Sequence, residues 1–131
     1  MTQIQLIALP KIEDHRGNLS VIENDTIPFD IKRVYYLYDV PSGAERGGHA
    51  HKEQQEVLIA LSGSFDVILN DGKTEKTVTL NKPNQGLLIG SGVWRELKNF
   101  SSGAVCLVIA SDVFNEDDYI REFDEFIAFV N

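Results

Sequence analysis

The chain has 131 residues, of which 43% are apolar, and this size predicts one domain, residues 1–131, around a single core. Its 20 acidic and 12 basic residues give a formal charge of −8, which argues against a nucleic-acid surface because such surfaces need clustered cations. The N-terminus lacks the cationic segment of a signal peptide and no run of about 18 apolar residues occurs, so we expect a soluble, cytoplasmic protein.

Short apolar runs rich in Val, Ile, Leu, Tyr and Phe follow one another along the chain, and each ends at Gly, Pro, Asn or Asp. This pattern predicts β-strands, because the 3.6-residue period of a helix is absent until the C-terminus. Many short strands at this spacing indicate an all-β fold, a sandwich or barrel of the jelly-roll kind. The predicted strands are residues 3–9, 19–23, 31–40, 47–51, 56–62, 65–70, 74–80, 86–89, 94–99 and 104–111.

Two local signals refine this pattern. The sequence Asn-Asp-Gly at 70–72 lies between two alternating runs and predicts a tight hairpin, since glycine supplies the positive φ that such a turn requires. The tail, residues 115–131, changes character: acidic residues at 116–118 favour a helix N-terminus, and apolar residues then recur at helical spacing. We therefore expect a short C-terminal helix packed on the barrel.

The most specific pattern lies between Gly43 and Gly63, where His49 and His51 are followed by Glu56. Alternate side chains of a β-strand point to the same face, so both imidazoles are expected on one face while Ala50 points to the other. Two titratable rings would then share one wall of a cavity.

Such a pair favours one of two chemistries. His49, His51 and Glu56 could supply three ligands to a metal ion, but the only other histidine, His15, lies near the N-terminus, and Ile89 stands where a further ligand is expected. Alternatively, the imidazoles could transfer protons at neutral pH, and a pair on one wall could serve two neighbouring carbons of one substrate. A purely structural hydrogen bond is the third possibility.

Cations and a phenol accompany the histidines. Alternation along the strand predicted over residues 31–40 places Arg33 and Tyr35 on one face. A guanidinium group binds phosphate oxygens in a bidentate manner, so arginines facing the cavity would suit an anionic ligand. The candidate ligand contacts among the five arginines are Arg16, Arg33, Arg46 and Arg95.

Several other residues have both a structural and a functional interpretation. Arg121 lies in the tail and is expected to pair with nearby acids, and Cys106, the only cysteine, lies in an apolar run typical of the core. Trp94 suits either base stacking or core packing. Gly47 and Gly48 indicate either a close approach of ligand to backbone or a β-bulge.

Taken in order, these residues resemble the sugar nucleotide 3,4-ketoisomerases of the cupin superfamily, enzymes that act on dTDP-4-keto-6-deoxyglucose. The resemblance covers essentially the whole chain, and RGGHAH joined to KRVYY is far more specific than the histidine spacing alone. The matching motifs are Asp14–Gly17, Lys32–Tyr36, Arg46–His51, the Asp71-Gly72 turn and Asp117–Phe126.

The resemblance implies a cupin jelly roll, a double-stranded β-helix that works without metal or other cofactor. It also implies a homodimer with exchanged strands and a role in making 3-amino sugars for bacterial surface glycans. The family's active-site histidines fall on His49 and His51. Its nucleotide and phosphate contacts fall on Arg33, Tyr35 and Arg46, whereas Arg16 and Arg95 fall near the sugar, at positions where family members differ.

The reaction implied is movement of the carbonyl group from C4 to C3 of the hexose through an enediol, with His49 favoured over His51 as the base. Two other classes stay open. A small metal-dependent cupin, such as a dioxygenase, would use the same histidines with Glu56, and a non-catalytic cupin would bind a nucleotide sugar without turnover.

Overall fold

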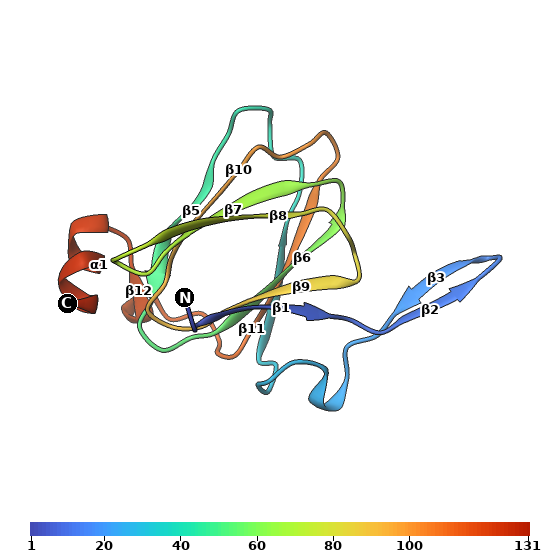
Figure 1. The fold of residues 1–131 in the computed structure, drawn as a ribbon, viewed down its shortest axis with the longest axis horizontal. Helices are drawn as coiled ribbons and strands as arrows, with labels where there is room; N and C mark the ends of the chain where they lie inside the picture. The colour runs from blue at the N-terminus through green and yellow to red at the C-terminus, as the bar shows by residue number, and fades with distance from the viewer.

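The computed structural model describes residues 1–131, and two antiparallel β-sheets face each other around the core (Figure 1). One sheet has the order β1 (Ile4–Ala8), β9 (Gln85–Ile89), β6 (Glu56–Ser62), β11 (Val105–Ala110), β4 (Arg33–Leu37). The other has the order β12 (Tyr119–Ile120), β5 (Arg46–His51), β10 (Trp94–Lys98), β7 (Phe65–Asn70), β8 (Glu75–Leu80). The predicted all-β jelly roll is confirmed.

The remaining elements lie outside the two sheets. A hairpin of β2 (Lys11–Asp14) and β3 (Gly17–Ser20) projects from the barrel, at the end opposite the helix α1 (Phe123–Val130) (Figure 1). Two short 3-10 turns, η1 (Asn24–Thr26) and η2 (Glu116–Asp118), complete the structure. The helix is too short to cross a membrane.

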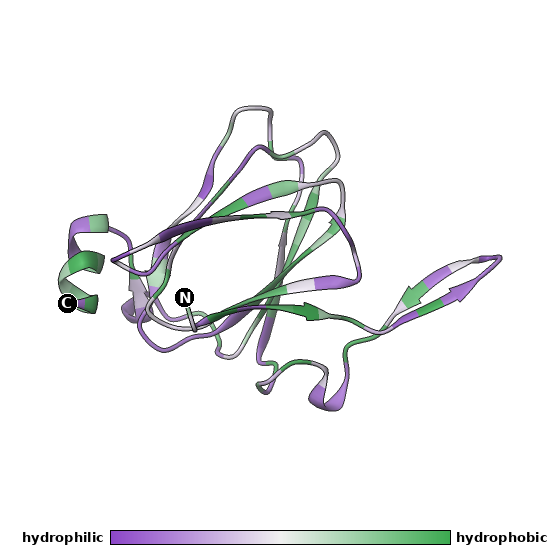
Figure 2. Ribbon diagram, in the orientation of Figure 1, coloured by the Kyte–Doolittle hydropathy of each residue, from purple (hydrophilic) through white to green (hydrophobic).

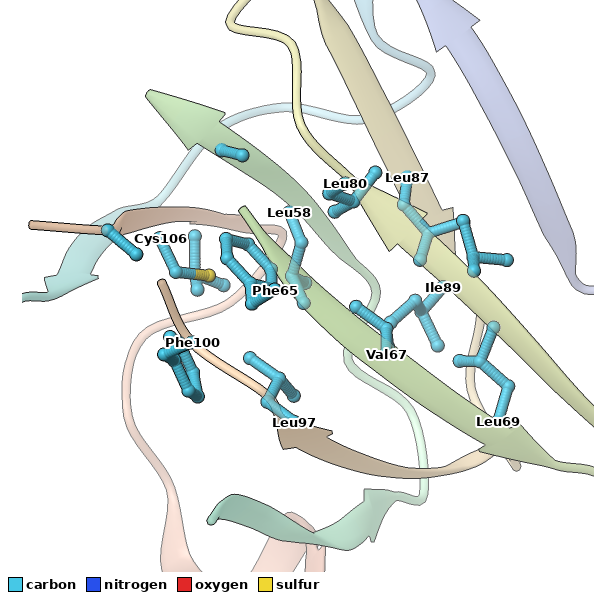
Figure 3. Packing of buried hydrophobic residues seen from close by; sticks show 14 of the residues in the cluster. Leu58, Phe65, Val67, Leu69, Leu80, Leu87, Ile89, Leu97, Phe100 and Cys106 are labelled. Atoms are coloured by element: carbon cyan, nitrogen blue, oxygen red, sulfur yellow. The ribbon is translucent and has the colours of Figure 1, made fainter. Parts of the chain in front are cut away.

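The core fills the space between the sheets because strand residues alternate between inward and outward positions. In β7, Phe65, Val67 and Leu69 are buried, while the residues between them are partly exposed. Apolar and polar residues alternate in this way along the strands in Figure 2. Figure 3 shows the buried side chains, Cys106 among them, pointing toward one another between the strands. Burial, reinforced by Glu56, raises the pKa of the Cys106 thiol to about 12, so this thiol belongs to the core as an apolar group.

Strands with a clear apolar pattern are found where the sequence predicts them, with the ranges 56–62 and 65–70 reproduced to the residue. The strand predicted over 19–23 is instead β3, which ends at Ser20. Its partner β2 was not predicted, because all four residues of β2 are exposed and carry no apolar alternation.

The tail differs from the prediction in one respect: the acidic residues at 116–118 do not begin the helix. They form η2, where the side chain of Asn115 accepts a hydrogen bond from the backbone N–H of Asp117 at 3.1 Å. The chain then pairs with β5 through β12 before α1 starts at Phe123. The physical reason is that pairing with an open sheet edge outweighs the local preference for a continuous helix.

Candidate active site

A cavity of about 310 Å³ lies between the two sheets and is lined by residues of both. Apolar side chains, among them Leu58 and Leu97, form part of the wall. The polar part is strongly cationic although the whole chain carries a charge of −8. The polar and charged lining residues are Arg33, Tyr35, Arg46, His49, Glu56, Arg95, Tyr119 and Arg121.

His49 and His51 lie side by side on β5, as the strand alternation predicts. Their ring centroids are 4.9 Å apart and the ring planes are nearly perpendicular. His49 lines the cavity, whereas His51 has no exposed surface and lies behind it. Ala50 points to the opposite face and packs beneath α1 against Phe126. The strand thus presents both imidazoles to the interior of the barrel.

A β-bulge next to the histidines explains the two glycines of the motif. On β10, Arg95 pairs with His49 and Glu96 pairs with Gly47, which leaves Gly48 as the extra residue of the bulge, and Gly47 and Gly48 both have positive φ. A Cβ atom at Gly47 would lie 3.1 Å from the carbonyl oxygen of Arg95, so a larger residue would push the two strands apart. The bulge interpretation therefore holds, and the bulge pairs His49 with Arg95 in register.

Both imidazoles are held neutral. Burial, together with the positive charge of Arg95 and the neighbouring ring of His51, lowers the pKa of His49 to about 2. Burial, followed by the charges of Arg95 and Arg33, lowers the pKa of His51 to about 3. The Nε2 atom of each ring is buried without a hydrogen-bond partner. Two neutral bases with unpartnered nitrogen atoms therefore lie side by side, His49 in the cavity wall and His51 behind it.

Glu56 is the centre of a buried hydrogen-bond network. Its Oε1 atom accepts from Nη1 of Arg95 at 2.6 Å, and its Oε2 atom accepts from the hydroxyl of Tyr35 at 2.8 Å and from Nε2 of Gln54 at 3.0 Å. Arg95 also donates to the carbonyl of Val93 at 3.1 Å. Burial and the Glu56 carboxylate raise the pKa of Tyr35, which keeps its hydroxyl a donor. The network fixes a cation and a phenol in the cavity wall.

This network also bears on the metal alternative. The ligand atoms of His49, His51 and Glu56 lie within 4.8 Å of one another, which is close enough for a shared ion. However, one Glu56 oxygen already contacts the Arg95 guanidinium at 2.6 Å. A divalent ion would have to lie beside that fixed positive charge, so the donor set fits a metal poorly.

The C-terminal segment contributes two site residues that the residue-by-residue sequence reasoning did not identify. Tyr119 pairs with His51 in the β12–β5 ladder, and its ring centroid lies 4.4 Å from that of His51 and 5.0 Å from that of His49. Asp118 places its Oδ2 atom 3.0 Å from Nδ1 of His51. The signal that could have found them is the motif 117–126, which contains both.

The predicted arginines have different positions. The guanidinium of Arg33 lies over the ring of Tyr35 at 4.8 Å and beside that of Phe114 at 5.5 Å, and its buried Nε atom has no partner. Arg46 is an exposed lining residue. Arg121 pairs with Glu116 through two hydrogen bonds of 2.6 and 2.8 Å, which confirms the expected pairing with a nearby acid.

Arg16 and Trp94 lie outside the cavity lining. Arg16 is at the tip of the β2–β3 hairpin and forms two side-chain hydrogen bonds of 2.9 Å with Asp14, so its contact with a sugar stays a prediction. Trp94 is buried and packs against Phe123 and Phe126 of α1. Its role is therefore core packing, and the base-stacking interpretation was wrong.

Comparisons with known proteins agree with this geometry. The curated TDP-4-oxo-6-deoxy-alpha-D-glucose-3,4-oxoisomerase of Aneurinibacillus thermoaerophilus is 47% identical over 127 residues, covering 96% of this chain and 91% of that protein. A 3,4-ketoisomerase from Helicobacter canadensis is 49% identical, with a TM-score of 0.94 and coverage of 97% of this chain and 96% of that one.

A third relative was solved with its ligand. It is a histidine-to-asparagine variant of the 3,4-ketoisomerase QdtA from Thermoanaerobacterium thermosaccharolyticum in complex with TDP-4-keto-6-deoxyglucose. It is 44% identical, with a TM-score of 0.97 and coverage of 99% of this chain and 95% of that one. The family model FdtA, described as WxcM-like, C-terminal, matches residues 2–131. The chain therefore belongs to the FdtA (WxcM-like) family of cupin-fold sugar nucleotide 3,4-ketoisomerases.

Proposed function

We propose that this protein is an isomerase that moves the keto group of dTDP-4-keto-6-deoxyglucose from C4 to C3, in the formation of 3-amino sugars. The observation that carries the proposal is the pair of neutral imidazoles, with His49 in the wall of a cavity rich in arginine and His51 directly behind it. Relatives that are 44–49% identical are named as 3,4-ketoisomerases or oxoisomerases, which supports the same substrate class.

The chemistry requires proton transfer but no change in atom count. A base removes the hydrogen of C3, and the electron pair forms a C3–C4 double bond while negative charge moves to the oxygen on C4. C4 then receives a proton, and the hydroxyl proton of the C3 oxygen passes to the C4 oxygen. His49 lines the cavity and is the favoured base, with His51 behind it. Each placed acid or base contributes about 10²- to 10⁴-fold to the rate.

The enediolate intermediate carries a charge that needs donors already in place. The Nε atoms of Arg33 and Arg95 are buried and have no partner in the protein, so each can donate to a ligand oxygen without breaking an existing bond. A buried donor without a partner is unfavourable, and a ligand that supplies the acceptor removes this penalty. We assign Arg95, fixed beside the histidines by Glu56, to the sugar oxygens.

The diphosphate needs cations that are free of internal ion pairs. Arg46 has an exposed side chain, and Arg33 is held by aromatic rings rather than by a carboxylate. These two residues are the proposed phosphate contacts, together with Tyr35 on the same strand face as Arg33. Binding energy from the nucleotide part would then fix the sugar over the histidines.

The test is to incubate the purified protein with dTDP-4-keto-6-deoxyglucose in deuterated water and to follow the C3 and C4 signals by NMR. The proposal expects a 3-keto product that carries deuterium at C4, and the C4 configuration gives the product epimer. Nucleotide binding without turnover would refute it in favour of a binding protein. The metal-dependent alternative is tested by measuring the metal content and the turnover of the protein with and without a chelator. Loss of turnover when a bound metal is removed would favour the metal-dependent cupin.

We further propose that the protein is a homodimer in which the β2–β3 hairpins are exchanged. Ile12 and Leu19 lie opposite each other in the hairpin and are 59% and 56% exposed. An isolated two-stranded ribbon is barely stable in water, so this apolar pair needs a covering surface. A second copy would supply it, and exchange would carry Arg16 onto the partner. Light scattering should give twice the chain mass, and a monomeric wild type would refute the proposal.

A further inference from the structure

The carboxylate of Asp118 lies at Nδ1 of His51, whereas Glu56 lies at Nε2, and two backbone N–H groups donate to this carboxylate. Its Oδ1 atom accepts from the backbone N–H of Glu53 at 2.8 Å. Its Oδ2 atom accepts from the backbone N–H of Gln54 at 3.2 Å and lies 3.0 Å from Nδ1 of His51. The turn after β5 therefore fixes the orientation of the carboxylate, and the carboxylate can only accept from His51.

This arrangement determines which nitrogen of His51 carries the hydrogen. A hydrogen on Nδ1 makes a good bond to Asp118, whereas its absence would place two acceptor atoms 3.0 Å apart. The alternative site, Nε2, faces Oε1 of Glu56 at 3.7 Å, which is too long for a hydrogen bond, and that oxygen already accepts from Arg95. The Nδ1–H tautomer is thus strongly favoured.

From this geometry we propose that Asp118 is a positioning residue for the isomerase reaction, holding His51 in the Nδ1–H tautomer so that Nε2 is the atom that exchanges a proton. The inference rests on the proposed function. It assigns to His51 a lone pair at a buried, unpartnered Nε2. When Nε2 gains a proton, the imidazolium lies 3.7 Å from Oε1 of Glu56, so the negative charge of that carboxylate stabilises the transient cation electrostatically.

The first test is the tautomer itself, which requires no substrate. The chain has only three histidines, so the imidazole nitrogen signals of protein labelled with ¹⁵N-histidine can be assigned by comparison with His51→Gln. The wild type should show His51 protonated at Nδ1 and bare at Nε2. A His51 ring protonated at Nε2 in the wild type would overturn the proposal without any reference to activity.

The second test is Asp118→Asn. The amide has one oxygen where the carboxylate has two, and we expect that oxygen at the Oδ1 position, which accepts the shorter backbone bond, 2.8 Å from Glu53 against 3.2 Å from Gln54. The amide nitrogen then takes the position of Oδ2, donates to Nδ1 of His51 and moves the ring hydrogen to Nε2. We expect this exchange in the spectrum and a fall in kcat of about 10²- to 10⁴-fold, with KM nearly unchanged. Asp117→Asn, an exposed neighbour with the same charge change, is the matched control and should retain the activity and spectrum of the wild type.

The outcomes separate the possible failures. An Asp118→Asn protein with the exchanged tautomer but normal kcat would overturn the positioning role. A merely structural Asp118 would lower the stability and raise KM without moving the hydrogen, which would also overturn it. A wild type that has the Nδ1–H tautomer but converts no dTDP-sugar would refute the proposed function, and would leave the tautomer assignment supported.

Discussion

The two buried histidines predict a steep loss of stability in mild acid. In the unfolded chain each imidazole has its ordinary pKa of 6.5, whereas in the folded protein the values are about 2 for His49 and about 3 for His51. Below pH 6.5 the unfolded state therefore binds more protons, so the free energy of unfolding falls as the pH falls. Each ring loses about 1.4 kcal/mol per pH unit, which amounts to about 2 kcal/mol at pH 5 and about 4 kcal/mol for both.

The assay is urea unfolding at about pH 7.5 and about pH 5, followed by the fluorescence of Trp94, the only tryptophan, at one protein concentration. Carboxyl groups with a lowered pKa, such as those of Asp66 and Asp71, also stabilise the folded protein, but this stabilisation is lost mainly at a pH below that of the assay. His49→Gln and His51→Gln should each remove about half of the loss. His15→Gln, which removes an exposed imidazole, is the control and should show the same loss of unfolding free energy as the wild type. If the variant that carries both His49→Gln and His51→Gln lost as much unfolding free energy in mild acid as the wild type, the reasoning would be refuted.

Three further predictions concern single residues. Glu56→Gln removes the charge that compensates buried Arg95, so urea unfolding should show a loss of about 3–5 kcal/mol, and a loss below about 1 kcal/mol would contradict the ion pair's importance. Arg46→Ala should raise KM by about tenfold with little change in kcat, because phosphate binding is remote from the chemistry; an unchanged KM would argue against this contact. His49→Ala should abolish isomerisation in the NMR assay while calorimetry still detects binding of TDP, and normal turnover would exclude His49 as the base.

The sequence predicted the parts of the site that lie within one strand, because alternation alone decides which side chains share a face. The neighbouring rings of His49 and His51, and the shared face of Arg33 and Tyr35, follow from period two. Asp118 could not be derived in this way. It meets His51 only because β12 pairs with β5 across 67 positions of the chain, and a two-residue strand has no apolar pattern of its own.

The role of Glu56 shows a related limit. Its position after the histidines suggests a metal ligand, and only the folded chain reveals that Arg95, 39 positions away, contacts the same carboxylate. The bulge at Gly47 and Gly48 could be recognised from the sequence as one of two possibilities, but the choice depended on the register between β5 and β10. Residues whose role depends on a partner from another strand therefore needed the structure.

The unpartnered nitrogen atoms at the cavity have a consequence for how the enzyme responds to its ligand. Side-chain nitrogens of Arg33, His49, His51 and Arg95 are buried with their hydrogen-bonding capacity unused. A ligand whose oxygen atoms bond to these nitrogens removes the cost of leaving them unpaired. The same nitrogens that bind the ligand therefore lower the stability of the ligand-free protein. Saturation with a bound sugar nucleotide should consequently raise the melting temperature more than saturation with the nucleotide alone at equal occupancy.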